Sequence, residues 1–266
     1  MGARLLAGVV GLAIVLPILY AGGWLVTVLV GFVVLVAMDE WSTMMAGSEP
    51  SRRGQHRRLL LPAGLAVFLG VLYAPPELRF TVPSLAIMAG LLVAMFADKD
   101  VTRAGNDGLR YVVGLLYVPL LLAPLVWLRA RPDGMGMVCF VLAVTWLGDT
   151  GAYFAGRFFG RTKLFERVSP KKTVEGALGG LLLSALGGTA IARAAGLPFG
   201  VAEALVLSAL LDVAGVVGDL VESMFKRAWG VKDSGWIMPG HGGILDRVDS
   251  LLFTAPLLWA WLLLRA

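Results

Sequence analysis

Residues 218–250 read GDLVESMFKRAWGVKDSGWIMPGHGGILDRVDS and carry ten charged or titratable side chains between two apolar segments of the chain. Helical spacing of i, i+3, i+4, i+7 and i+8 would place one group on a single face: Asp219, Glu222, Ser223, Lys226 and Arg227. Residues 235–243 contain four glycines and a proline, which is typical of a loop. Asp246 and Asp249 then stand three residues apart at the start of the last apolar segment. The stretch therefore predicts two acidic faces joined by a glycine-rich loop, framed by the rest of the chain.

The composition of the whole chain is that of a membrane protein. Of its 266 residues, 58% are hydrophobic and 15% are charged, and the mean hydropathy is +0.81. Soluble domains average about 25% charged residues. We therefore expect an all-α, polytopic integral membrane protein made of a single transmembrane domain, residues 1–266. Within it, residues 1–130 would form a scaffold and residues 131–266 would carry the catalytic site.

Nine apolar segments are candidates for membrane-spanning helices. They lie at residues 5–20, 24–38, 59–74, 82–97, 109–128, 134–150, 176–196, 200–221 and 248–265. With a cytoplasmic N-terminus, 18 of the 23 Lys and Arg residues fall on the cytoplasmic side and five on the outer side. Because positive residues collect on the cytoplasmic side, this split predicts an N-in, C-out topology. It also places loops 149–175 and 219–249 on the cytoplasmic face.

Two further cytoplasmic segments have no evident chemistry. The sequence SRRGQHRR (51–58) predicts a topogenic patch that faces lipid headgroups, with His56 in solvent. The sequence DKDVTRAGND (98–107) predicts a solvated turn. We expect neither segment to take part in the site.

The connection between the sixth and seventh apolar segments carries a second group of candidates. Asp149 ends one segment, and the glycines of residues 151–160 predict a seam where two helices approach closely. In SPKKTVEG (169–176), Ser169 before Pro170 matches a helix N-cap followed by proline at the first helical position. The next residues, Lys171, Lys172 and Thr173, would then lie in the first turn, where the helix dipole disfavours cations. A bound anion would resolve that conflict, although anchoring by the positive-inside rule is the simpler alternative.

The acidic residues at membrane depth are candidates for a metal site. Asp219, Asp246 and Asp249 border apolar segments, where acidic side chains are functional candidates, and Glu222 is a weaker candidate. Oxygen ligands with few histidines suit Mg²⁺, which binds through one or two carboxylates plus substrate phosphates. The residues disfavour zinc, because His241 has only His56 as a histidine partner and the sequence contains no pair of cysteines. For Asp212 the residues leave open an extra polar site or an interhelical hydrogen bond.

Several function classes compete with a metal-dependent transferase. A Walker-type ATPase is excluded because no GxxxxGK[ST] motif is present. A transporter or channel would need polar residues on both sides of the membrane midplane, and the outer halves of the segments have almost none. A CDP-alcohol phosphotransferase is disfavoured because residues 107–110 do not fit its D-G-x-x-A-R motif. A CTP-dependent lipid kinase stays open as the nearest rival.

Three motifs give the chain a specific resemblance. The fixed positions of the first are Ser223, Lys226-Arg227, Lys232-Asp233, Gly235, Met238-Pro239, His241-Gly242-Gly243, Asp246-Arg247 and Asp249. The other two are GDxxAYxxGxxxGR at 148–161 and SPKKTxEG at 169–176. With these motifs the chain resembles the phosphatidate cytidylyltransferases, also called CDP-diglyceride synthases. The resemblance covers the C-terminal half in detail and the whole chain in hydropathy.

The resemblance implies a reaction in which CTP and phosphatidic acid give CDP-diacylglycerol and pyrophosphate at the inner membrane. It implies Mg²⁺, leaves open a second, monovalent cation such as K⁺, and suggests a homodimer; no nucleic acid partner is expected. Catalysis would depend on Asp219, Lys226, Arg227, Asp246, Arg247 and Asp249, with Asp219, Asp246, Asp249 and Glu222 as metal ligands. Substrate contacts would come from Asp149, Ser169, Lys171, Lys172, Thr173, Ser223, Lys232, Asp233, His241, Gly242 and Gly243.

Overall fold

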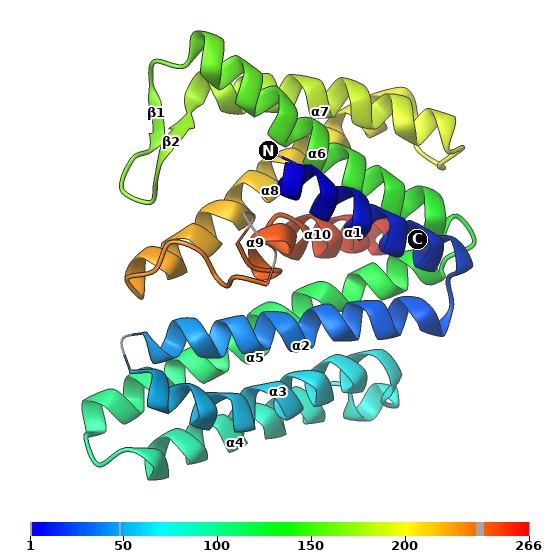
Figure 1. Cartoon of the computed structure of the whole chain (residues 1–266). Coiled ribbons are helices and arrows are strands. Elements are labelled where there is room, and N and C mark those ends of the chain that lie inside the picture. Colours follow the sequence, from blue (N-terminus) through cyan, green and yellow to red (C-terminus); the bar gives the residue numbers. More distant parts are fainter. Residues whose placement is uncertain (1, 48, 238–241, 266) are drawn as a thin grey trace. The chain divides into compact units, whose positions relative to one another are not determined.

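The computed structural model describes residues 2–47, 49–237 and 242–265, and most of them are helical (Figure 1). The chain divides into two compact units. Unit 1 comprises Met1–Val126 and Ala228–Arg247, and unit 2 comprises Trp127–Arg227 and Val248–Ala266. The chain passes between them at Val126–Trp127, close to the expected boundary after residue 130, but the loop after residue 227 belongs with the N-terminal helices.

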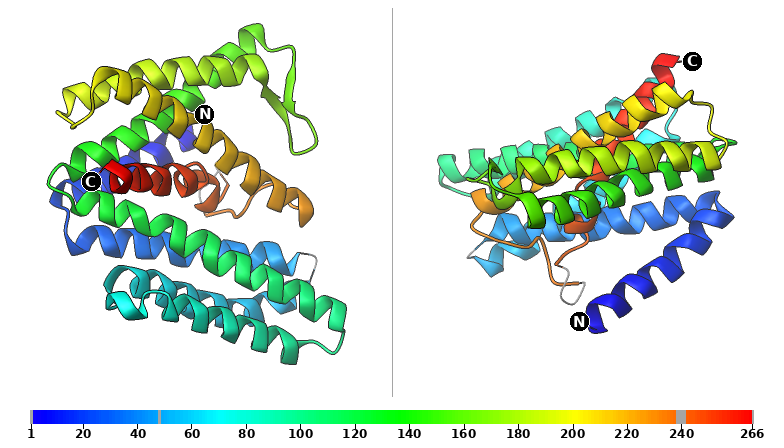
Figure 2. Two further views of the ribbon diagram at one scale, coloured as in Figure 1. Left: turned by 180° about the vertical axis from the view of Figure 1, so that it is seen from behind. Right: turned by 90° about the horizontal axis from the view of Figure 1, so that it is seen from above.

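Unit 1 is built from antiparallel helices. Its elements are α1 (Gly2–Ala21), α2 (Trp24–Ala46), α3 (Pro50–Tyr73), the short 3₁₀ helix η1 (Pro76–Leu78), α4 (Thr81–Ala97), most of α5 (Val101–Ala130) and α9 (Leu245–Val248). Helices α2 and α3 lie side by side, as do α3 and α4 (Figure 2). Helix α2 ends at Ala46, and Gly47 follows it with a positive φ of 53° while its N–H donates to the carbonyls of Thr43 and Met44. Trp41 is fully buried beside Tyr117, and its indole N–H donates to the carbonyl of Arg110 at 3.1 Å.

Unit 2 holds the end of α5, α6 (Gly134–Phe159), α7 (Val174–Ala194), α8 (Val201–Ala228) and α10 (Leu251–Arg265). A two-stranded hairpin, β1 (Lys163–Phe165) and β2 (Ser169–Thr173), connects α6 to α7 and projects from their shared end (Figure 1). The predicted glycine seam between α6 and α7 is confirmed. A Cβ at Gly151 would overlap the carbonyl oxygen of Gly179, and one at Gly180 would lie 2.7 Å from the carbonyl oxygen of Gly148.

Eight helices among the described residues are long and apolar enough to cross a membrane, by length and composition. They correspond to the second through ninth predicted segments, so the all-α, polytopic membrane class is confirmed. The first predicted segment is also a helix, α1, of which Gly11–Ala21 is a shorter apolar piece.

The first of the two segments expected to be solvated is partly buried within unit 1, whereas the second is exposed at most of its positions. Residues 51–58 form the start of α3, where His56 is fully buried and its Nδ1 lies 2.7 Å from the Tyr111 hydroxyl. Arg57 pairs with Asp39 at 2.6 Å, and Arg52 pairs with Asp107, which is only 4% exposed. The expectation of a solvent-exposed His56 was therefore wrong. Residues 99–103, 105 and 106 are exposed as expected, although the helix α5 already begins at Val101 and Asp107 is buried. Helix packing supplies Arg52, Arg53 and Arg57 with acidic partners from other elements, and local sequence does not reveal those partners.

Candidate active site

The face of α8 that carries the predicted charges forms as expected. Glu222 is fully buried and pairs with Lys226 one turn later, while Ser223 Oγ donates to Asp219 Oδ1 at 3.3 Å. Arg227 lies exposed at the end of the helix. Because the Glu222 carboxylate already neutralises a buried ammonium, it fits a structural role on this face better than that of a metal ligand.

The predicted helix start at Ser169 is wrong. Ser169–Thr173 form strand β2, in which Ser169 pairs with Phe165 and Thr173 pairs with Lys163. Helix α7 begins at Val174, and its N-cap is Thr173, whose side chain accepts a hydrogen bond from the N–H of Gly176 at 3.1 Å. Ser and Thr are similar N-caps in isolation, so the choice follows from strand pairing, which the local sequence does not reveal.

Glu175, in the first turn of α7, fixes the hairpin to the helix. Its carboxylate accepts hydrogen bonds from the backbone N–H groups of Arg161 at 3.0 Å and Thr162 at 3.1 Å. The N–H of Val174 donates to the carbonyl of Thr162 at 2.9 Å. These bonds hold both ends of the hairpin, and with them the backbone of its two adjacent lysines.

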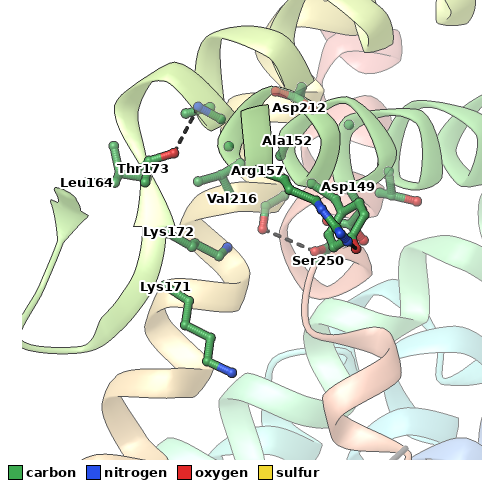
Figure 3. Close-up of a pocket in the computed structure, with 17 residues that line it drawn as sticks. Asp149, Ala152, Arg157, Leu164, Lys171, Lys172, Thr173, Asp212, Val216 and Ser250 are labelled. Carbon is green, nitrogen blue, oxygen red and sulfur yellow. Dashed lines mark hydrogen bonds between the residues drawn. The ribbon is translucent and has the colours of Figure 1, made fainter. Parts of the chain in front are cut away.

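A pocket of about 390 Å³ lies within unit 2, between α6, α8 and the hairpin (Figure 3). Its polar lining includes Asp149 from α6, Asp212 from α8, and Lys171, Lys172 and Thr173 from the hairpin. Much of its remaining wall consists of small residues such as Gly148, Ala152, Gly156, Gly176 and Gly215, which leave room for a ligand. The pocket therefore has carboxylates and ammonium groups in its wall together.

Lys172 connects this pocket to the acidic face of α8. Its Nζ lies 2.7 Å from Asp219 Oδ2, and the two side chains are 26% and 30% exposed. Lys171, the neighbouring residue on the strand, is more exposed, and its ammonium group has no hydrogen-bond or ion-pair partner within residues 2–47, 49–237 and 242–265. The two lysines thus lie next to each other in sequence but differ in their surroundings.

Four carboxylates in unit 2 lie close enough to interact electrostatically. Asp249 interacts with Asp219 and Asp149, and Asp212 interacts with Asp149 and with Lys172. Asp212 is buried, and it fills the space beside Gly148 near Ser184, so it both packs between helices and lines the pocket. Asp249 lies in the turn between α9 and α10. Helix α8 approaches that turn closely at Gly218, where an added Cβ would lie only 2.6 Å from the Asp249 carbonyl oxygen.

The remaining predicted site residues belong to unit 1. Asp246 Oδ2 accepts hydrogen bonds from the Ser234 N–H at 2.9 Å, the Ser234 hydroxyl at 2.9 Å and the Gly243 N–H at 2.7 Å. Asp246 therefore organises the loop that precedes it. On this loop and α9, Lys232, Asp233 and Arg247 are exposed. Gly242 adopts a positive φ of 80°, whereas His241 lies outside the described residues.

Glu40 is a functional candidate that the sequence reasoning missed. It is only 3% exposed on α2, and its carboxylate accepts hydrogen bonds from the Ser234 hydroxyl, the Ile244 N–H and the Leu245 N–H at 3.0, 2.8 and 2.8 Å. The signal was available, because Glu40 borders the second apolar segment and acidic residues there are candidates by default. Glu40 and Asp246 together hold the two ends of the glycine-rich loop.

The carboxylates of unit 2 are chemically suited to Mg²⁺. Within the described part of the chain, no three His, Cys, Asp or Glu side chains converge into a complete ligand set. Mg²⁺ does not need one, because it binds through one or two carboxylates and keeps waters or substrate phosphates as its other ligands. Asp219 and Asp249 supply hard oxygen donors that interact electrostatically with each other, so they fit this ion.

Comparison with known proteins agrees with the motifs. Residues 2–264 match the cytidylyltransferase family. The phosphatidate cytidylyltransferase of Staphylococcus aureus (strain COL) is 33% identical over 259 residues, 97% of each chain. Those of Staphylococcus epidermidis (strain ATCC 35984) and Staphylococcus haemolyticus (strain JCSC1435) are 32% and 34% identical over 264 and 258 residues, again 97% of each chain. This protein therefore belongs to the cytidylyltransferase family.

Proposed function

We propose that this protein transfers the cytidylyl group of CTP to phosphatidic acid, giving CDP-diacylglycerol and pyrophosphate for phospholipid biosynthesis. The observation that carries the proposal is the match to phosphatidate cytidylyltransferases over 97% of both chains. The lysines and carboxylates of the unit 2 pocket support it, because a nucleotide triphosphate needs cations for its phosphates and ligands for an accompanying metal ion.

The chemistry is an in-line displacement at the α-phosphorus of CTP. A phosphate oxygen of phosphatidic acid forms a new bond to that phosphorus, while the bond to the bridging oxygen of the β-phosphate breaks and pyrophosphate leaves. A phosphomonoester with a second pKa near ~6 is largely dianionic at neutral pH, so no general base is required. The protein's task is therefore to position the reactants and to neutralise charge.

Residues of unit 2 are placed for that task. Lys171 and Lys172 would bind phosphate oxygens, and Asp149 would orient a reactant in the pocket. Thr173 joins the lysine-bearing strand to α7, because it pairs with Lys163 of β1 and caps the helix. Asp219 and Asp249 would hold Mg²⁺, which supplies electrostatic stabilisation of the charge on the transferring phosphoryl group. The roles implied for Lys226, Arg227, Lys232, Asp233, His241 and Arg247 toward phosphate, and for Asp246 toward metal, stay predictions.

We place the protein in the inner membrane with the site facing the cytoplasm. The uneven distribution of Lys and Arg supports this orientation, and CTP is a cytoplasmic substrate whereas phosphatidic acid is a lipid. A homodimer is a further proposal, supported by the family resemblance. Light scattering of the detergent-purified protein would test it, and a monomeric mass would refute it.

The test of the reaction uses purified protein, phosphatidic acid, Mg²⁺ and CTP labelled separately at the α- and γ-phosphates. We expect the α-label in the lipid fraction with release of pyrophosphate. Transfer of the γ-label would identify a CTP-dependent lipid kinase instead. Asp219→Asn should abolish transfer, whereas Glu77→Gln, which changes an exposed acid on η1, should leave it unchanged.

A further inference from the structure

The ion pair between Lys172 and Asp219 occupies a carboxylate that the proposed function assigns to Mg²⁺. The Lys172 Nζ lies 2.7 Å from Asp219 Oδ2, the length of an ordinary charge-assisted hydrogen bond. At that distance the ammonium takes one oxygen of the carboxylate directly. A metal ion that binds the same oxygen must therefore displace the ammonium.

The lysine can leave without unfolding its surroundings. Its backbone is fixed by the pairing of β2 with β1, by the Thr173 cap and by the bonds of Glu175 to the other end of the hairpin. A lysine side chain is a flexible four-carbon chain, and this one is about one quarter exposed. Its ammonium can therefore move into the pocket, which Lys172 also lines, while the strand stays in place.

The charges around Asp219 make the displacement unfavourable unless another anion accepts the lysine. Asp249 interacts with Asp219, and Asp212 interacts with Lys172. The ammonium thus partly neutralises a group of carboxylates that would otherwise repel one another. Transfer of Lys172 to a phosphate would preserve its pairing, and it would free Asp219 for the metal at the same time.

We propose that Lys172 is a positioning residue that competes with Mg²⁺ for Asp219 in the ligand-free protein and is transferred to a CTP phosphate when the nucleotide binds. Metal and nucleotide then bind with positive coupling, because both require Lys172 to separate from Asp219 and the binding of either one favours that separation. The inference rests on the proposed function. It adds that the metal binds tightly only together with the nucleotide.

Lys171 provides a matched control within the same strand. It has the same charge and lines the same pocket, but it is exposed and lacks an acidic partner among the described residues. Loss of either ammonium removes one positive charge from the pocket. Only loss of Lys172 should release Asp219.

The experiment measures Mn²⁺ binding by electron paramagnetic resonance in the full-length protein, first without nucleotide and then with CTP. Without nucleotide, Lys172→Met should bind Mn²⁺ on the order of tenfold more tightly than the unsubstituted protein, because the competing ammonium is gone. Lys171→Met and the charge-conserving Lys172→Arg should bind it unchanged. With CTP, the affinity of the unsubstituted protein for Mn²⁺ should rise, and this rise should be smaller in Lys172→Met, where only the phosphate ligands of CTP and not the release of Asp219 contribute to it.

Unchanged or weaker Mn²⁺ binding by Lys172→Met would overturn the proposal, because a merely structural lysine has no reason to oppose a metal. Lys172→Gln provides a second, polar variant if the methionine variant does not fold. Mn²⁺ binding is read out without any transfer of label from CTP. If Lys172→Met does not bind Mn²⁺ more tightly, the competition between Lys172 and the metal is refuted, but the cytidylyltransferase assay is unaffected. If the α-label of CTP is not transferred to lipid, the proposed function is refuted, and Mn²⁺ binding still tests the competition.

Discussion

The carboxylate of Glu40 accepts a hydrogen bond from the backbone N–H of Leu245 at 2.8 Å, although the two residues are 205 positions apart. Through this bond and those to Ile244 and Ser234, a side chain of the second helix holds the end of the glycine-rich loop. A loop of this composition has little regular structure of its own. Buried acceptors such as Glu40 therefore determine its conformation.

Replacement of Glu40 by alanine should destabilise unit 1. Each buried donor left without an acceptor costs about 1–3 kcal/mol, so the loss of this carboxylate should lower the unfolding free energy by at least about 2 kcal/mol. We expect a lower Tm in detergent and loss of cytidylyl transfer. Glu49→Ala is the control, because within the described part of the chain the side chain of that exposed acid makes only long ion pairs with Arg52 and Arg103, so its loss should change the Tm little.

Replacement of Asp246 by asparagine should loosen the glycine-rich loop. Asp246 Oδ2 accepts three hydrogen bonds from Ser234 and Gly243, and an amide oxygen is a weaker acceptor for all three. We expect faster hydrogen exchange at the amides of Ser234 and Gly243 and at least tenfold slower turnover. Unchanged exchange at both amides would contradict the organising role assigned to Asp246.

Replacement of Glu175 by glutamine should loosen the hairpin. The backbone N–H groups of Arg161 and Thr162 would lose a charged acceptor. Hydrogen exchange of these two amides should become faster, and the KM for CTP should rise because Lys171 and Lys172 are less well fixed. The matched control is Glu166→Gln, which removes an exposed acid from the turn of the same hairpin. An equal effect of both variants would show that net charge, and not anchoring, is responsible.

Two glycine-to-alanine substitutions should have opposite effects on stability. A methyl group at Gly151 would overlap the carbonyl of Gly179 in the α6–α7 seam, and such overpacking costs about 1–3 kcal/mol. At Gly54, in the exposed part of α3, nothing lies within 4 Å of the added methyl group. Alanine should stabilise that helix by about 0.5–1 kcal/mol. Thermal unfolding in detergent measures both, and a stabilising effect at Gly151 would argue against the seam.

The motifs identified many of the residues, while the tertiary structure identified their partners. Asp219 and Lys172 were both predicted site residues, but their direct ion pair depends on how β2 packs near α8. Glu40 was missed because the reasoning followed motifs in the C-terminal half of the chain. The start of α7 was predicted four residues early, since a Ser-Pro pair resembles a helix start and strand pairing is a non-local property.

The sequence by itself determined that this is a helical membrane protein and which family it belongs to. Apolar segments and fixed motif positions are local properties, and their physical meaning does not depend on neighbours far along the chain. Only the tertiary structure decided which charges are paired, which are buried and which line the pocket. Ion pairs such as Arg52–Asp107 and hydrogen bonds such as Leu245–Glu40 join residues that are distant in sequence. Their strength depends on separation and burial, which are fixed only when the helices pack.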